Sequence, residues 1–129
     1  MTVDTSAVLA ILFAAPDAEH YARAISNAPV CRMSVATFAE ISIVMESQTG
    51  DRGSRQWDQF FRRAGFALEP VTKEQAYAAR QARSDVGKGR SPAKLDFGDC
   101  FSYALARTLG EPPLFKSADF SRTDVSSAI

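Results

Sequence analysis

The chain alternates between two hydrophobic spacings, and this alternation predicts strands and helices in turn. Short β-prone runs occur at Met1–Val3, Pro29–Met33, Phe66–Val71 and Pro113–Lys116, with a last edge strand expected near Val125. Apolar residues recur at helical spacing in Ala7–Ala15, Asp17–Ala28, Ser34–Gln48, Asp51–Arg63, Thr72–Val86 and the stretch after Asp96. Strands that alternate with helices favour a mostly parallel sheet with helices on both faces.

Turn and capping residues mark the boundaries of these elements. Gly50 is expected to stop the first long helix, and Gly65 to end the helix that follows it. Thr72 and Gln75 match a capping box, which places a helix start at Thr72. A polar stretch with two glycines and a proline, residues 87–94, predicts a loop before the last helix.

Length and charge narrow the possible classes of protein. A chain of 129 residues predicts one domain, residues 1–129. With 46% hydrophobic and 23% charged residues it can bury a core. Lys+Arg and Asp+Glu number 15 each, so net charge gives no sign of a nucleic-acid or membrane partner. Any such partner must be recognised by the local distribution of charge.

The compartment is predicted from apolar runs and cysteines. No apolar run approaches the roughly 20 residues that cross a bilayer, and the N-terminus lacks the basic start of a signal peptide. Cys31 and Cys100 are far apart and lie in apolar contexts. They are expected to be reduced core residues of a cytoplasmic protein.

Glu40 is the most informative single residue. It is the only charged side chain between Arg32 and Glu46, in an otherwise largely apolar helix. A lone carboxylate is costly to bury unless a cation or hydrogen bonds compensate its charge. The alternative is that Glu40 lies on an exposed stripe with Thr37 and Ser47.

Four aspartates occur where predicted strands end or helices begin: Asp4, Asp96, Asp99 and Asp119. Each has an ordinary explanation, as a helix cap, a first-turn acid or an Asx-turn. In a doubly wound sheet, however, the strand ends share one crevice. Carboxylates within about 4 Å repel by about 4 kcal/mol per pair at an effective dielectric near 20, so a cluster needs protons or metal ions. An all-oxygen site suits Mg²⁺ or Mn²⁺.

The sequence does not contain the residues that several other kinds of catalytic or binding site require. His20 is the only histidine and has a polar helical context, which leaves no basis for a Ser/His/Asp triad, a Cys/His pair or a histidine–zinc site. Neither GxxxxGK[ST] nor GxGxxG occurs. A receiver-type signalling domain needs an aspartate at the end of its third strand, and Leu68–Val71 contains none.

The same residues resemble a known family, the PIN-domain nucleases, and among them the VapC toxins of bacterial VapBC toxin–antitoxin modules. The matching pieces are Val3–Ala7, the Ala39–Glu40 pair, Asp96–Ala106 (DFGDCFSYALA) and Leu114–Asp124 (LFKSADFSRTD). They cover essentially the whole chain, and the last two segments are the specific ones. The resemblance implies a three-layer α/β/α fold with strand order 3-2-1-4-5.

The resemblance also implies a site and a reaction. The family's acidic quartet falls on Asp4, Glu40, Asp99 and Asp119. Asp4 and Asp99 would hold Mg²⁺ or Mn²⁺, with Glu40 and Asp119 binding directly or through water, for hydrolysis of RNA phosphodiester bonds. Thr5, Ser6 and Asp96 are expected to support the site; Asp96 stands where relatives often carry asparagine, and Ala118 where they often carry a polar residue.

RNA must reach an acidic crevice along a basic rim. The candidates are Lys116, Arg122, Arg90 and Lys94, followed by Arg83 and Lys88, with Arg107 a weaker one. Lys116 and Arg122 rank first because they flank Asp119. A rival within the same fold is a structure-specific DNA nuclease, which this short chain disfavours because nothing extra is present to grip a duplex.

Two protein partners follow from the resemblance. An antitoxin would lay an amphipathic segment in an apolar groove, for which Leu12 and Phe13 are candidate lining residues, and would send a basic side chain into the acidic site. A homodimer is also expected. The amphipathic helix with Trp57, Phe60 and Phe61 is one candidate surface for it.

Overall fold

A computed structural model describes residues 1–87, 95–116 and 127–128. Their strands form one parallel sheet in the order β3-β2-β1-β4. The strands are β1 (Thr2–Val3), β2 (Arg32–Ser34), β3 (Ala67–Glu69) and β4 (Pro113–Leu114). This order confirms the predicted 3-2-1-4 arrangement. The fifth strand, predicted near Val125, lies outside the described residues.

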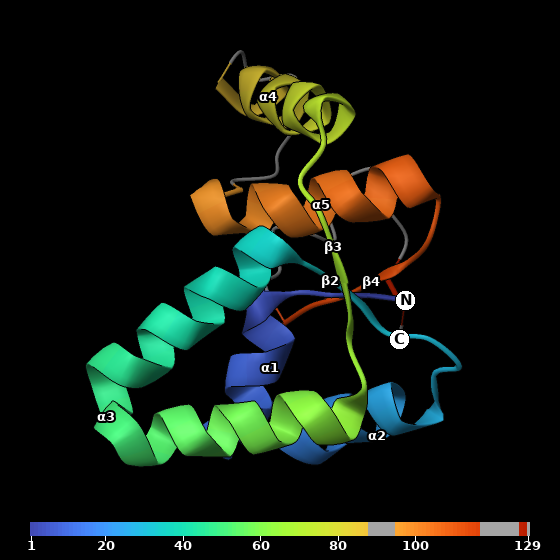
Figure 1. The fold of residues 1–129 in the computed structure, drawn as a ribbon. Coiled ribbons are helices and arrows are strands. Elements are labelled where there is room, and N and C mark those ends of the chain that lie inside the picture. Colours follow the sequence, from blue (N-terminus) through green and yellow to red (C-terminus); the bar gives the residue numbers. More distant parts are fainter. Residues whose placement is uncertain (88–94, 117–126, 129) are drawn as a thin grey trace.

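Helices cover both faces of the sheet (Figure 1). The helices are α1 (Thr5–Leu12), α2 (Ala18–Asn27), α3 (Val35–Ala64), α4 (Lys73–Gly87) and α5 (Phe97–Leu109). On one face lies α5, with α4 packed on its outer side, whereas α1 and α2 lie on the other face. The predicted α/β class with three layers is therefore confirmed.

Helix α3 consists of two arms that meet at Gly50, as Figure 1 shows. Gly50 has φ 65° and ψ −154°, a conformation outside the helical region. The predicted stop at this glycine is thus confirmed, although the second arm follows without an intervening loop. Ser34 caps the first arm by accepting a hydrogen bond from the Ala36 N–H at 3.2 Å, and Gly65 ends the second arm in the left-handed region.

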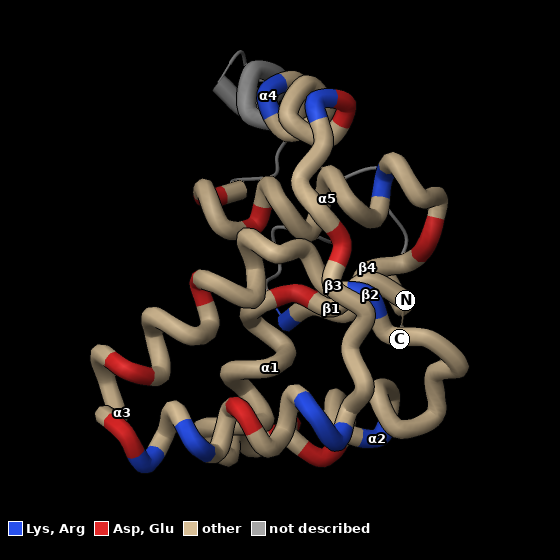
Figure 2. The backbone as a smooth tube through the Cα atoms, viewed as in Figure 1, with Lys and Arg blue, Asp and Glu red and all other residues tan. Residues whose placement is uncertain are grey.

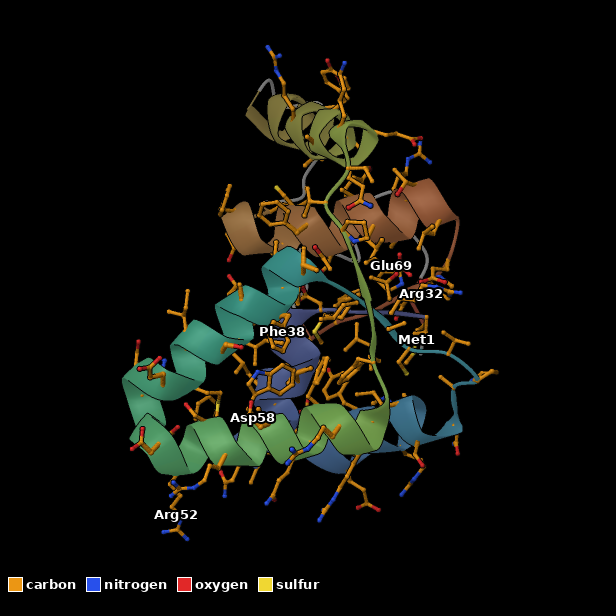
Figure 3. All side chains as sticks on the ribbon, viewed as in Figure 1. Met1, Arg32, Phe38, Arg52, Asp58 and Glu69 are labelled. Carbon is orange, nitrogen blue, oxygen red and sulfur yellow. The ribbon has the colours of Figure 1, made fainter. Side chains whose placement is uncertain are left out.

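The two arms of α3 are held together by an aromatic cluster. Trp57 is 1% exposed, and its indole N–H donates to the Ser42 hydroxyl at 2.9 Å. Phe38 lies between the arms (Figure 3), with ring centroids 5.8 Å from Trp57 and 5.0 Å from Phe61. Phe60 and Phe61 also pack against the core. This aromatic face therefore packs largely against the core, and the dimer surface predicted at this helix stays a prediction.

A second apolar cluster joins α4 to α5. Leu95 and Cys100 are buried there, and the small residues Ala79 and Ala82 of α4 pack against them. The predicted start of α4 is partly confirmed, since the Gln75 N–H donates to the Thr72 hydroxyl at 3.1 Å. The Gln75 side chain donates to the Pro70 carbonyl at 3.2 Å instead of closing the box.

An ionic cluster ties the amino ends of three strands together. The Glu111 carboxylate, just before β4, accepts from Arg32 at 2.7 Å and from the Thr2 hydroxyl at 2.7 Å. It also lies 3.4 Å from the terminal ammonium of Met1. Arg32 is also 3.6 Å from Glu69, and Figure 3 shows Met1, Arg32 and Glu69 near one another. The acidic residues described next lie at the other, carboxyl end of the strands.

Two smaller predictions concern the cysteines and the membrane. Cys31 and Cys100 are both buried and are not joined in a disulfide, as expected. None of the helices in the described ranges is long and apolar enough to cross a bilayer.

Candidate active site

Asp4 directly follows β1 and is 1% exposed. It caps α1, because its Oδ2 accepts from the Ser6 N–H at 3.0 Å and from the Ser6 hydroxyl at 2.7 Å. Its Oδ1 is buried and accepts no hydrogen bond of normal geometry from the described residues. Burial raises the pKa of Asp4, and nearby hydroxyl and amide donors only oppose this effect. One oxygen of the carboxylate, Oδ2, therefore caps the helix, and the other oxygen, Oδ1, still has lone pairs that can bind a ligand.

Glu40 lies half-buried on the first arm of α3. Its Oε1 accepts a hydrogen bond from the Thr5 hydroxyl, which orients the carboxylate from the first turn of α1. Burial raises the pKa of Glu40, and the negative charges of Asp4 and Asp96 raise it further against the hydrogen bond from Thr5. The predicted alternative, a solvated stripe, does not describe this side chain.

Asp96 and Asp99 form a reciprocal capping box at the start of α5. The Asp99 N–H donates to Asp96 Oδ1 at 2.7 Å, and the Asp96 N–H donates to Asp99 Oδ2 at 3.1 Å. Burial, followed by the charge of Asp4, raises the pKa of Asp99 to about 7. The capping function expected for Asp96 is present, and it fixes the carboxylate of Asp99.

These four carboxyl groups converge at the carboxyl edge of the sheet from three helices. Asp4 raises the pKa values of both Glu40 and Asp99, and Asp96 does the same, which is the electrostatic sign of close approach. Figure 2 shows acidic positions at the starts of α1 and α5 and on the first arm of α3. The fourth acid of the predicted quartet, Asp119, lies outside the described residues.

The donor set is chemically suited to a hard cation but is incomplete within the described part of the chain. Residues 1–87, 95–116 and 127–128 contain no group of three His, Cys, Asp or Glu side chains already arranged around a metal position. Carboxylate oxygens are nevertheless the donors that Mg²⁺ and Mn²⁺ prefer. Asp4 Oδ1 accepts no hydrogen bond of normal geometry there, although the Ser102 hydroxyl lies near enough to lower the pKa of Asp4. A cation would satisfy this oxygen and relieve the repulsion among the acids.

Ser6 and Lys116 connect β4 to the site. The Lys116 N–H donates to the Ser6 hydroxyl at 2.8 Å, and that hydroxyl donates to Asp4. The ammonium group of Lys116 pairs with Asp17 at 3.0 Å, which lowers the pKa of Asp17. Of the predicted basic rim, Lys116 thus lies beside the site in an ion pair. The remaining rim candidates that rank with it, Arg90, Lys94 and Arg122, fall outside the described residues.

Sequence reasoning missed three residues that shape the site. A Cβ on Gly98 would lie 2.1 Å from Glu40 Oε2, so the carboxylate packs directly on this glycine. Thr37 and Ser102, both buried, are joined by a hydroxyl–hydroxyl contact of 3.2 Å between α3 and α5. The sequence spacing could have identified the two hydroxyls. Thr37 precedes Glu40 by three positions and Ser102 follows Asp99 by three, which places each pair on one helix face.

The two residues predicted to line an antitoxin groove differ in exposure. Phe13 is 44% exposed, whereas Leu12 is partly buried and packs against the core. A groove lined mainly by apolar side chains lies beside Glu40.

The fold and the acidic edge define a class of protein that comparison with known sequences confirms. Residues 1–126 match the PIN domain family. The chain therefore belongs to the PIN-domain family, and within it to the VapC proteins, as its relatives show.

Two relatives are similar over almost their whole length. The chain is 49% identical over 127 residues to a protein named Ribonuclease VapC from Mycolicibacterium smegmatis, covering 98% of each chain. It is 48% identical over 130 residues to Ribonuclease VapC28 from Mycobacterium tuberculosis, covering 100% of this chain and 98% of the relative.

Solved structures share the fold at low sequence identity. Mycobacterium tuberculosis VapC20, described as a Sarcin-Ricin loop cleaving toxin, superposes with a TM-score of 0.78 at 20% identity, covering 97% of this chain and 95% of that one. VapBC2 from Rickettsia felis, solved on a DNA fragment from its promoter, gives a TM-score of 0.75 at 12% identity, covering 95% and 92%.

Proposed function

We propose that this chain hydrolyses RNA phosphodiester bonds at the acidic edge of its sheet, with Mg²⁺ or Mn²⁺ as cofactor. Its family makes it a ribonuclease toxin of a type II toxin–antitoxin system. The observation that carries the proposed site is that contacts with Thr5 and Gly98 bring Glu40 to the starts of α1 and α5, where Asp4 and Asp99 lie. Burial raises the pKa of all three acids, and Asp4 Oδ1 is buried without a hydrogen bond of normal geometry from the described residues. Such a cluster is stabilised by a cation.

Each residue of the site has a proposed part in holding the ion. Asp4 and Asp99 would bind it directly, and Glu40 and Asp119 would bind it directly or through water. When bound, the ion would supply an activated water and neutralise charge that develops on the phosphoryl oxygens. The chain would supply rigid positioning of these acids.

Three neighbouring side chains would fix the orientation of the acids. Ser6 holds Asp4 through two hydrogen bonds, Thr5 holds Glu40, and Asp96 holds Asp99 through the capping box. We assign all three to positioning. Asp96 is exposed, and a contact of its carboxylate with the ion remains a secondary part of the proposal.

RNA would approach along cations near the site. We assign this role to Lys116, Arg122, Arg90 and Lys94 by their positions in the chain. Lys116 must exchange its ion pair with Asp17 for a phosphate. Both groups are partly exposed, so the exchange costs little.

The partners we propose are a VapB-type antitoxin and a second copy of the chain, acting in the cytoplasm as one domain of residues 1–129. Two structural neighbours are toxin–antitoxin complexes, from Rickettsia felis and Klebsiella pneumoniae. Co-expression of the chain with the adjacent open reading frame should yield a complex that survives purification, and a chain that elutes alone would contradict the antitoxin proposal.

The activity is tested with antitoxin-free protein, total RNA and either Mn²⁺ or a chelator. We expect cleavage only with the ion, and a loss of at least about 100-fold in Asp4→Asn and Asp99→Asn, a loss of the size that removing a charge-stabilising group from a site can cause. Asp58→Asn, an exposed acid on the second arm of α3, is the matched control and should cleave like the wild type. Equal cleavage by all four proteins would refute the assignment, and preferential cleavage of DNA in parallel reactions would support the rival nuclease.

A further inference from the structure

Two buried hydroxyl groups join α3 to α5 next to the candidate site. Thr37 is 1% exposed and Ser102 is 0% exposed, and their hydroxyl oxygens lie 3.2 Å apart. Thr37 lies about one helical turn before Glu40, and Ser102 lies about one turn after Asp99. A buried hydroxyl is costly unless it is hydrogen-bonded, so the partners of this pair show what it stabilises.

The Thr37–Ser102 pair differs from other helical hydroxyls of the chain in its hydrogen bonds. Ser42, Thr49 and Thr108 each donate to the carbonyl four residues earlier in their own helix. Within the described residues neither Thr37 nor Ser102 makes such a bond, and the two contact each other instead. Each hydroxyl has one proton, so the pair has two protons and the contact between them uses one. The second proton is available to a third group.

The carboxylate of Asp4 lies within reach of the Ser102 hydroxyl. Burial raises the pKa of Asp4, and Ser102 opposes this effect more than Ser6 or Thr5 does. Oδ2 of Asp4 already accepts twice from Ser6. Oδ1 is buried and accepts no hydrogen bond of normal geometry from the described residues. The second proton of the hydroxyl pair therefore has a buried acceptor beside it.

We propose that Ser102 is a positioning residue for Asp4: Thr37 donates to Ser102, and Ser102 donates to the Asp4 carboxylate and fixes its orientation for the cation. The order of donation follows from the acceptor, because an ionised carboxylate has no proton to give. The donation is to Oδ1, the oxygen that does not accept from Ser6. A carboxylate oxygen has two lone pairs, so Oδ1 can accept from Ser102 and still bind an ion. Neither hydroxyl has to touch the RNA or the ion.

The hydroxyl pair links the orientation of Asp4 to the packing of two helices. Helix α3 carries Thr37 and Glu40, and helix α5 carries Ser102 and Asp99, so the same helix contact sets the positions of all three acids. Hydrogen bonds to a metal-binding side chain are typically worth about 10- to 100-fold in metal affinity. The inference rests on the proposed function, because Asp4 is proposed there as a ligand of the cation.

The experiment is calorimetric titration of the antitoxin-free full chain with Mn²⁺. Ser102→Ala should bind Mn²⁺ at least about tenfold more weakly than the wild type. Thr37→Val keeps the shape of the side chain without its hydroxyl and should bind at least about threefold more weakly, whereas Thr37→Ser keeps the hydroxyl and should bind like the wild type. Ser42→Ala is the control for a purely structural effect, because the Ser42 hydroxyl on the same helix accepts from Trp57. It should lower the melting temperature and leave the affinity unchanged.

The double variant tests whether Thr37 acts through Ser102. Adding Thr37→Val to Ser102→Ala should weaken Mn²⁺ binding no further, and a further loss of about threefold would refute the proposed order of donation. Circular dichroism establishes that each variant is folded. Wild-type affinity in Ser102→Ala, or in Thr37→Val if Ser102→Ala does not fold, would overturn the inference and leave the proposed cation site intact. A wild type that binds no Mn²⁺ would instead refute the cation site, and this inference with it.

Discussion

The two oxygens of the Asp4 carboxylate have different environments, and this difference defines the site at the residue scale. Oδ2 accepts two hydrogen bonds from Ser6, and Oδ1 accepts none from the described residues. Burying such an oxygen is costly unless another group compensates it. The cost is tolerable if the protein functions with a cation bound. A cation would also explain why Glu40 and Asp99 lie near enough to Asp4 for its charge to raise their pKa values.

The raised pKa of Asp99 can be tested through the pH dependence of stability. Its pKa rises from 3.8 to about 7 on folding, so between these values the folded carboxyl keeps a proton that the unfolded chain has released. The folded state then binds more protons, and the free energy of unfolding must fall as pH rises through this window. Denaturant unfolding of chelator-treated protein should show this fall in the wild type and a weaker one in Asp99→Asn.

The comparison with Asp99→Asn isolates this one group. Asp4 and Glu40 also have raised pKa values and act in the same direction, but both proteins share them. The asparagine side chain can still accept from the Asp96 N–H, so the cap persists. Identical pH profiles for the two proteins would show that Asp99 titrates normally.

Gly98 permits the close packing of Glu40, and a double-mutant cycle measures it. Alanine is favoured over glycine in a helix by up to about 1 kcal/mol. In Gly98→Ala the new Cβ would meet the Glu40 carboxylate, so we expect lost stability instead of a gain. In a Glu40→Ala background the same change should stabilise the protein. Thermal unfolding of the wild type, the two single variants and the double variant measures both effects. If Gly98→Ala changed stability in the same direction in the wild type and in Glu40→Ala, the contact between Gly98 and Glu40 would be contradicted.

At the scale of elements, Gly50 sets the angle between the arms of α3. Its φ of 65° and ψ of −154° lie near a region that only glycine occupies readily. Nothing lies within 4 Å of a Cβ placed there, so the effect of a substitution is on the backbone alone. Gly50→Asn should cost about 1–3 kcal/mol of unfolding free energy. Gly65→Asn, at an ordinary left-handed helix end, should cost clearly less, and equal costs would contradict this account.

The ionic cluster around Glu111 joins the amino ends of three strands. Its side chain is 15% exposed and satisfies Arg32, Thr2 and the chain terminus. Glu111→Gln should therefore destabilise the protein by about 1–3 kcal/mol in denaturant unfolding, because charged partners lose a mostly buried acceptor. The control Glu19→Gln removes an exposed pair with Arg23 and should change stability by less than about 0.5 kcal/mol. Similar losses in the two variants would argue against a structural role for the cluster.

At the scale of the whole molecule, hydrophobic spacing and turn residues were enough to predict the order of the described strands and helices. Strand lengths were overestimated, as in Phe66–Val71 against the observed Ala67–Glu69, because pairing with neighbours decides where a strand ends. Spacing also identified the aromatic face of Trp57 correctly as apolar. It could not reveal that the other arm of α3 covers this face, since that depends on tertiary structure.

The candidate site was also only partly predictable from the sequence. The sequence predicted that Asp4, Glu40 and Asp99 approach one another, and it treated helix capping and site function as alternatives for Asp4. The structure has one carboxylate oxygen capping the helix and leaves the other to the site. The contact of Gly98 with Glu40 depends on the packing of two helices, so only coordinates could disclose it. The position of Asp119 remains a prediction.

We propose that the acidic edge of the sheet holds a divalent cation, and calorimetric titration with Mn²⁺ measures this binding. The wild type and the distant control Asp58→Asn should bind Mn²⁺ with the same affinity. Asp4→Asn should bind at least about tenfold more weakly, the change expected for about 1.4 kcal/mol of lost ligand interaction. Binding of Mn²⁺ to Asp4→Asn with the affinity of the wild type would show that the Asp4 carboxylate does not hold the cation.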